Sequence, residues 1–99
     1  MKTLLLALAM APYAHVIVEQ SPSVTLNVTI AANGAISVDG RPVKDEAELE
    51  ARARDAVRKS PDARAVIAAD KAVQYGKVIA AMDALKRGGI TRLSFAVAP

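Results

Sequence analysis

The sequence contains neither cysteine nor tryptophan among its 99 residues. Without cysteine the chain has no disulfide bond, no thiol nucleophile and no cysteine-ligated metal, and its redox compartment stays open. Aromatic residues are limited to Tyr13, Tyr75 and Phe95, so the core must be aliphatic. The single histidine, His15, precedes the predicted folded region, and no catalytic triad or metal cluster is predicted around it.

The common enzyme motifs are also missing. The chain has no glycine-rich phosphate loop, no metal-ligand spacing and no paired-carboxylate signature for acid–base chemistry. No base stands in the sequence near Ser23, Ser37, Ser60 or Ser94. We therefore predict that the protein is not an enzyme and has no catalytic residue, metal or cofactor.

The excess of positive charge is small. Thirteen Lys and Arg residues against ten Asp and Glu residues give a net charge of +3 and a pI near 9.5, and the basic residues are spread along the chain. Nucleic-acid-binding domains usually cluster their basic residues on one face and often add aromatic residues for stacking. Neither feature is present in the sequence, so binding to nucleic acid is not predicted.

The first 22 residues form a segment of their own. Residues 3–18 carry no formal charge, but they fall short of the ~20 apolar residues of a transmembrane helix, and Pro12 interrupts them. A basic start before a short apolar run is typical of a secretory signal, although cleavage after residues 9–11 would leave Pro12 just after the cut. Both a cleaved signal and a membrane anchor stay open, and the domain is predicted at residues 23–99.

A hairpin is predicted next. Apolar and polar residues alternate from Val24 to Ile30, which is the pattern of a strand with one buried face. Asn33 and Gly34 both tolerate positive φ and predict the turn, after which the alternation resumes at residues 36–38. Residues 41–43 then lead out of the hairpin.

A helix is predicted to begin at Asp45, which with Glu48 resembles a capping box. Glutamates lie near its start and basic residues near its end, as the helix dipole favours. Glu48 with Arg52 and Glu50 with Arg54 have the spacing of i,i+4 ion pairs. The narrow apolar face of this helix consists of Leu49, Ala53, Ala56 and Val57.

Residues 65–97 predict a β-α-β unit. The apolar run at 65–69 suits a central strand or one covered on both faces. A helix follows from Val73 to Arg87, and Gly88-Gly89 can end it. The second strand runs parallel to the first by the right-handed crossover rule. The apolar face of the helix comprises Tyr75, Val78, Ile79, Met82 and Leu85.

The whole chain therefore predicts a small two-layer α+β domain of order β-β-α-β-α-β. Two helices cover one face of a mixed sheet, and an N-terminal apolar segment precedes the domain. Asp70 stands at the carboxyl end of a strand, where α/β sheets often bind ligands. The favoured interpretation is that Asp70 caps the first turn of the following helix.

Short motifs in a consistent order resemble the periplasmic domain of the ExbD/TolR family over residues 24–97. Each motif is weak alone, but their order and spacing together are fairly specific. The motifs are Val28-Thr29-Ile30, Asn33-Gly34, Ile36-Ser37-Val38, Gly40-Arg41-Pro42-Val43, Ala69-Asp70-Lys71, Tyr75-Gly76-Lys77-Val78-Ile79, Met82-Asp83-Ala84-Leu85, Gly88-Gly89-Ile90 and Leu93-Ser94-Phe95.

The resemblance implies an accessory subunit of an energy-coupling complex in the bacterial inner membrane, with its domain on the periplasmic side. The implied partners are an ExbB/TolQ-like proton-channel subunit, a TonB/TolA-like protein, a second copy of the chain and, for some members, peptidoglycan. Partner contacts are expected at the exposed sheet face or edge and near Asp70 and Tyr75, although Tyr75 is equally well explained as a core residue. In the family, one transmembrane helix and a short linker precede the domain, and residues 11–12 and 16–18 resemble the end of that helix and the start of that linker. The family's helix carries an aspartate for proton-driven coupling, whereas residues 1–18 contain no acidic residue.

Two other functions compete with this one. The first is a soluble periplasmic binding module that reuses the fold after its signal is cleaved, without a channel partner. The second is a cytoplasmic nucleic-acid-binding domain in which residues 3–18 form part of the core.

Overall fold

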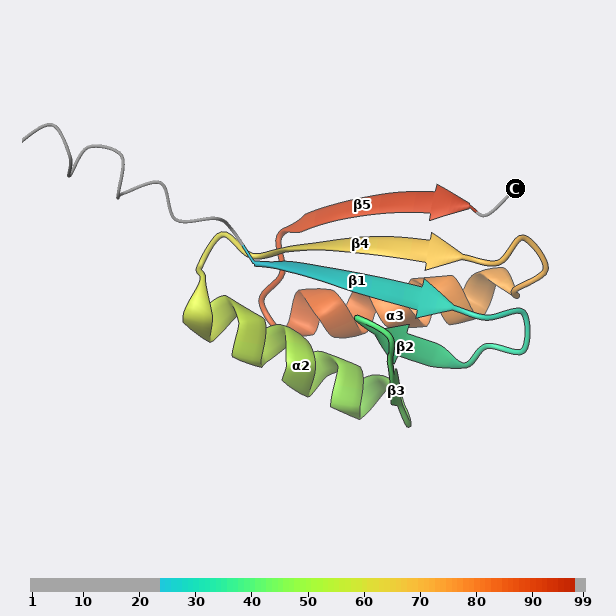
Figure 1. Cartoon of the computed structure of the whole chain (residues 1–99), viewed down its shortest axis with the longest axis horizontal. Coiled ribbons are helices and arrows are strands. Elements are labelled where there is room, and N and C mark those ends of the chain that lie inside the picture. The colour runs from blue at the N-terminus through green and yellow to red at the C-terminus, as the bar shows by residue number, and fades with distance from the viewer. Residues whose placement is uncertain (1–23, 98–99) are drawn as a thin grey trace, which may run out of the picture.

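A computed structural model describes residues 24–97 of the chain. The elements follow in the order β1 (Thr25–Ile30), β2 (Ile36–Val38), β3 (Arg41–Val43), α2 (Glu46–Lys59), β4 (Arg64–Ala69), α3 (Tyr75–Arg87) and β5 (Arg92–Val97). The strands form one five-stranded sheet in the order β3-β2-β1-β4-β5, and both helices lie on the same face of it (Figure 1). The predicted two-layer α+β fold is confirmed.

The sheet is mixed, as expected. β1 and β2 are antiparallel around the turn at Asn33 and Gly34, whereas β4 pairs in parallel with both β1 and β5. The central position of β4 and the parallel return of β5 are therefore confirmed. The sequence interpretation missed β3, whose three residues pair with β2 at the sheet edge. Pro42 lacks a backbone N–H, and an edge strand is where a sheet tolerates that.

One side of the sheet faces the helices and holds the core. On β4, Ala65, Ile67 and Ala69 are buried there, whereas Val66 is half-buried and Ala68 is exposed on the other side. The prediction that β4 could be covered on both faces is therefore wrong. Its apolar pattern is uninterrupted because β4 contains small alanines. Exposing an alanine to water costs little free energy, since its apolar area is small.

The helices contribute mostly small side chains to this core. Their buried residues are Leu49, Ala53 and Ala56 on α2 and Val78, Ala81, Ala84 and Leu85 on α3. The predicted apolar face of α2 is thus confirmed in its main residues. On α3, however, Tyr75 is 76% exposed, so its alternative explanation as a core residue is wrong. Tyr75 is the first residue of the helix, where a side chain points back beyond the helix end.

The start of α2 and the end of α3 follow the sequence signals. Asp45 Oδ1 accepts a hydrogen bond from the Glu48 backbone N–H at 2.9 Å, and Glu48 Oε1 accepts one from the Lys44 N–H at 2.9 Å. Gly89 has φ +109°, which supplies the left-handed conformation predicted after α3.

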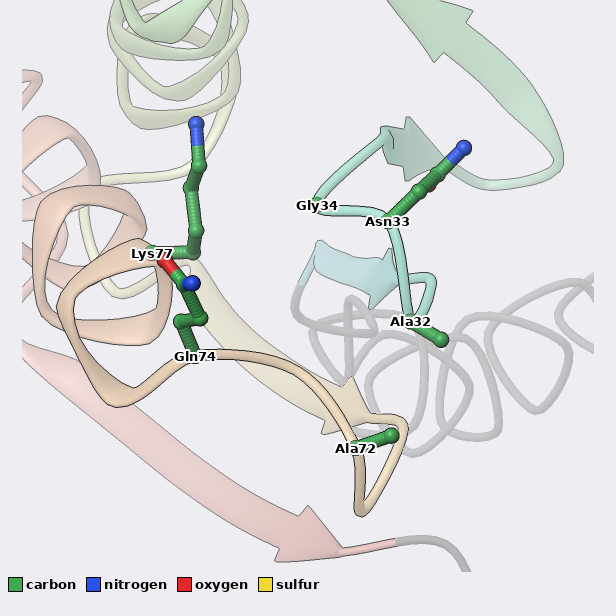
Figure 2. A pocket seen from close by; sticks show the side chains of 6 residues that line it. All are labelled: Ala32, Asn33, Gly34, Ala72, Gln74 and Lys77. Carbon is green, nitrogen blue, oxygen red and sulfur yellow. The ribbon is translucent and has the colours of Figure 1, made fainter.

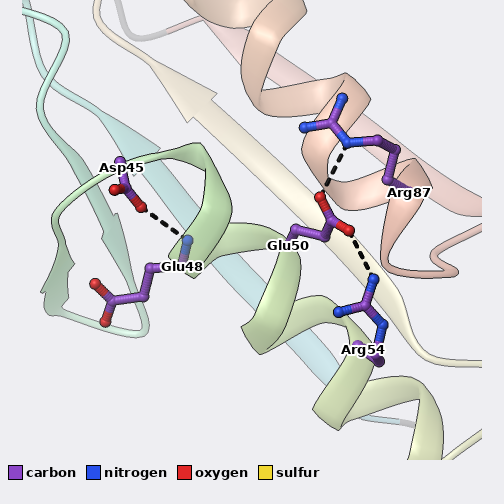
Figure 3. A network of polar contacts seen from close by, with 5 residues as sticks. All are labelled: Asp45, Glu48, Glu50, Arg54 and Arg87. Atoms are coloured by element: carbon purple, nitrogen blue, oxygen red, sulfur yellow. Dashed lines mark hydrogen bonds and ion pairs between the residues drawn. The ribbon is translucent and has the colours of Figure 1, made fainter.

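Glu50 links the two helices (Figure 3). One carboxylate oxygen accepts a hydrogen bond from Arg87 Nε on α3 at 2.9 Å, and the other lies 2.6 Å from Arg54 on α2. The predicted Glu50–Arg54 pair is present, and a longer contact of 4.0 Å joins Glu48 to Arg52. The hydrogen bond from Arg87, followed by that from Arg54, holds the pKa of Glu50 below its ordinary value of 4.5.

This lowered pKa predicts that acid weakens the junction between α2 and α3. A carboxyl group whose pKa is depressed by folding stabilises the folded state above its unfolded pKa of about 4.5, and that contribution disappears as the pH falls through the folded pKa. Glu50→Gln should therefore lose less stability than the wild type when thermal melts are compared from about pH 6 to about pH 3. Asp83→Asn, which neutralises an exposed carboxylate on α3, is the matched control. Parallel pH profiles for Glu50→Gln and the wild type would contradict the assignment.

Candidate partner-binding site

The two edges of the sheet differ in how they are protected. β3 is short and contains Pro42, and both features discourage pairing with another strand. β5 has six residues, no proline and a single charge at Arg92. Among residues 24–97, no strand pairs with the outer side of β5. An edge of this kind is a ready template for a strand from another chain.

A hollow of about 230 Å³ lies beside this edge, at the carboxyl ends of β4 and β5. Of the large hydrophobic side chains that the structure describes, Tyr75 and Phe95 are the exposed ones, at 76% and 52%. Both line this hollow, and aromatic side chains next to an apolar hollow are typical of protein interfaces. The full lining consists of Ala69, Asp70, Lys71, Val73, Tyr75, Val78 and Phe95.

The position of β5 explains why Phe95 is exposed. Phe95 is the register partner of Ile67 and shares its face of the sheet, yet Ile67 is fully buried. β5 is the outermost strand on this side, so Phe95 lacks a neighbouring strand that would shield its outer flank. Sequence reasoning did not single out Phe95 as a contact residue, because its exposure depends on the order of the strands in the sheet.

Asp70 organises the loop that borders the hollow. Its Oδ1 accepts a hydrogen bond from the Ala72 backbone N–H at 2.8 Å, and its carbonyl accepts one from the Val73 N–H at 3.0 Å. The helix cap itself is Gln74, whose side chain makes no capping bond. The prediction that Asp70 caps α3 is therefore wrong, because its carboxylate forms an Asx turn before the helix. The structure brings Asp70 and Tyr75 to one hollow, while their contact with a partner stays a prediction.

A second hollow of about 290 Å³ separates the β1–β2 turn from the start of α3 (Figure 2). Lys77 lies on its helical side, and Asn33 and Gly34 lie on the turn side. Asn33 uses its Oδ1 to accept the Ala35 backbone N–H at 2.9 Å, so this side chain holds the turn. The remaining lining residues are Ala32, Ala72 and Gln74, and this mixture suggests no particular ligand.

Residues 24–97 contain no group of three or more His, Cys, Asp or Glu side chains that could hold a metal ion. Neither helix in this part of the chain has the length and apolar character needed to cross a membrane. The predicted signal or anchor segment, residues 1–22, lies outside the described part of the chain.

Comparison with known proteins identifies the family. The family model described as "Biopolymer transport protein ExbD/TolR" matches residues 3–99. This chain belongs to the ExbD/TolR family. It is 35% identical over 79 residues to the biopolymer transport protein ExbD of Neisseria gonorrhoeae and to that of Neisseria meningitidis serogroup B.

Those alignments cover 78% of this chain and 55% of each relative. The chain thus spans about half the length of the curated relatives that it matches. ExbD/TolR proteins form a transport family and not an enzyme family, which confirms the prediction that this chain is not an enzyme.

Proposed function

We propose that this ExbD/TolR chain is an accessory subunit of a complex that couples the proton-motive force of the bacterial inner membrane to transport. The complex would be of the ExbB-ExbD-TonB or TolQ-TolR-TolA type. The observation that carries the proposal is the combination of the unpaired β5 edge with the exposed hollow at Tyr75 and Phe95. These features suit a domain that works by contacting other chains.

The distribution of charge around the N-terminal segment supports a periplasmic domain. Lys2 precedes the apolar run, and no Lys or Arg occurs between Thr3 and Gly40. Positive residues near a membrane-spanning segment remain on the cytoplasmic side. With residues 3–18 as an anchor, Lys2 would face the cytoplasm and residues 24–97 would lie in the periplasm.

The partner contacts would use both features of the candidate site. A second copy of the chain or a TonB/TolA-like protein would pair with β5 and cover Tyr75, Asp70 and Phe95. An ExbB/TolQ-like channel subunit would contact the N-terminal segment, and peptidoglycan is a further candidate ligand. In each case the domain would bind and transmit force without changing a covalent bond.

The length of the apolar run favours one alternative. Residues 3–18 are shorter than a usual transmembrane helix and resemble the core of a secretory signal. The alternative is a soluble periplasmic module that binds partners through the same surface after cleavage and has no channel subunit.

Fractionation of the native organism separates these functions. The tagged chain is located in membrane or periplasm, its intact mass is measured, and its co-purifying proteins are identified. A full-length mass in the membrane together with a polytopic channel subunit is the expected result. A shorter mass in the periplasm, cut near residues 11–14, would contradict membrane anchorage and support the soluble module.

Tyr75→Ala tests the contact surface itself. Tyr75 is 76% exposed, so its truncation should change the free energy of unfolding by less than about 0.5 kcal/mol. Loss of an aromatic anchor from an interface should still reduce partner recovery by about tenfold or more in co-purification. Gln74→Ala, one residue away on the other hollow, is the control and should leave recovery unchanged. Equal recovery with Tyr75→Ala and the wild type would remove Tyr75 from the interface.

A further inference from the structure

Basic side chains gather at the end of the domain where β1 begins. β1, β4 and β5 are parallel and start at this end, and α2 and α3 finish there because each returns the chain to the start of the next strand (Figure 1). Basic residues that are far apart in the sequence are thereby brought to one end of the molecule. We call this cluster the basic end, and it consists of Arg58, Lys59, Arg64, Lys86 and Arg92, all exposed.

The register places the basic end directly beside the chain's entry into the domain. Thr25 pairs with Arg64, and Arg64 pairs in turn with Arg92. The Arg64 backbone N–H donates to the Val24 carbonyl at 3.0 Å. Lys59 and Val24 line one hollow, whose other charged residues are Asp39, Arg41, Arg52 and Asp55. The segment that precedes Val24 therefore joins the domain among these cations.

The helix dipole favours Arg58, Lys59 and Lys86, because they lie in the last turns of α2 and α3. It gives no such reason for Arg64 and Arg92, which lie on strands. Arg64 and Arg92 are opposite one another on neighbouring strands, and like charges in that position destabilise a sheet. Arg52, Arg54 and Arg87 form ion pairs with glutamates of α2. Arg58 lies 3.7 Å from Asp55. The like-charged pair Arg64 and Arg92 costs the sheet stability, and it points to an anionic surface outside the domain.

We propose that the basic end docks on the anionic phospholipid headgroups of the membrane that holds residues 3–18. This inference rests on the membrane anchorage in the proposed function. Residues 19–23, which separate the apolar run from Val24, can span at most about 18 Å. The domain is thus tethered close to the headgroups, and an anionic lipid surface attracts Lys and Arg residues within about a Debye length, roughly 8 Å at physiological salt.

Docking would also orient the candidate site. The hollow at Tyr75 and Phe95 lies at the carboxyl ends of β4 and β5, whereas the basic end lies at their starts. A strand of six residues is about 20 Å long. Contact of the basic end with lipid would hold the hollow and the far end of the β5 edge away from the membrane, toward partners in the periplasm.

The absence of cysteine from the chain allows a direct test. Single-cysteine variants Thr91→Cys, at the basic end, and Ala32→Cys, at the opposite end, carry a fluorophore on the full-length chain. The chain is reconstituted into vesicles of phosphatidylcholine, with or without phosphatidylglycerol, that contain a quencher attached to the lipid headgroup. Quenching at Thr91→Cys should be at least about twofold stronger with phosphatidylglycerol and should fall at about 0.5 M salt, while quenching at Ala32→Cys stays low.

Charge variants then identify the residues responsible. Arg64→Gln with Arg92→Gln should abolish the effect of phosphatidylglycerol on quenching. The control pair Lys71→Gln with Lys77→Gln removes the same charge at the other end and should leave the effect intact. Circular dichroism of each variant verifies that it folds.

Several results would overturn the inference. Equal quenching at Thr91→Cys in both vesicle types would mean that the tether alone holds this end near the lipid. Equal losses of quenching with both charge pairs would mean that the net charge of the domain alone causes the effect. An effect that appears only with a channel subunit in the vesicle would assign the basic end to an acidic protein surface. If the chain floats with both vesicle types but phosphatidylglycerol has no effect on quenching, this inference is overturned and membrane anchorage stands. If the chain floats with neither vesicle type, membrane anchorage is overturned as well.

Discussion

Ile67→Ala is expected to lower the free energy of unfolding by about 2–5 kcal/mol. Ile67 is fully buried at the centre of β4, where it pairs with Val28 on one side and Phe95 on the other. Alanine would leave a cavity beneath the helices, and the many alanines around it have no length with which to fill the space. Small domains are stable by only about 5–15 kcal/mol, so this loss is a large fraction of the total.

Val66→Ala is the matched control for this prediction. Val66 is the adjacent residue but is half-buried on the sheet face that the helices leave uncovered. Its truncation should cost less than about 1 kcal/mol, because little apolar area returns to water. Urea denaturation, analysed with one m-value for both variants, measures the two changes in the free energy of unfolding. Equal costs at the two positions would show that another chain covers the second face in the folded protein.

Gly88→Ala is expected to destabilise the domain by about 1–3 kcal/mol through overpacking. Gly88 ends α3 where that helix crosses α2, and a Cβ there would stand 2.5 Å from Ala53 Cβ and 2.7 Å from the Glu50 carbonyl oxygen. The backbone is not the cause, since Gly88 has φ −76°, which alanine adopts readily. The two helices would have to separate, and the Glu50–Arg87 hydrogen bond between them would lengthen.

Gly76→Ala provides the opposite expectation on the same helix. No atom lies within 4 Å of a Cβ at Gly76, which is in the first turn of α3. Replacing such a glycine should leave stability unchanged or raise it by up to about 1 kcal/mol, because alanine restricts the unfolded chain. Thermal and urea denaturation of both variants measure the difference. A stable Gly88→Ala variant would contradict the close approach of the helices.

The sequence by itself determined the features that arise from neighbouring residues. The turn at Asn33 and Gly34, the cap at Asp45 and the glycine stop after Arg87 each depend on the conformation or hydrogen bonds of a few adjacent residues. The parallel return of β5 also followed, because the handedness of crossovers restricts the alternatives. The ordered motifs pointed to the ExbD/TolR family, which the family comparison confirmed.

Only the tertiary structure decided which faces and ends come together. It showed that Tyr75 is exposed at the start of α3, that Phe95 lacks a shielding neighbour, and that β5 is the open edge of the sheet. Basic residues that look dispersed in the sequence meet at one end because parallel strands begin side by side. The physical reason is that burial, edge position and clustering of charge depend on strand order and helix placement, which no local pattern of residues specifies.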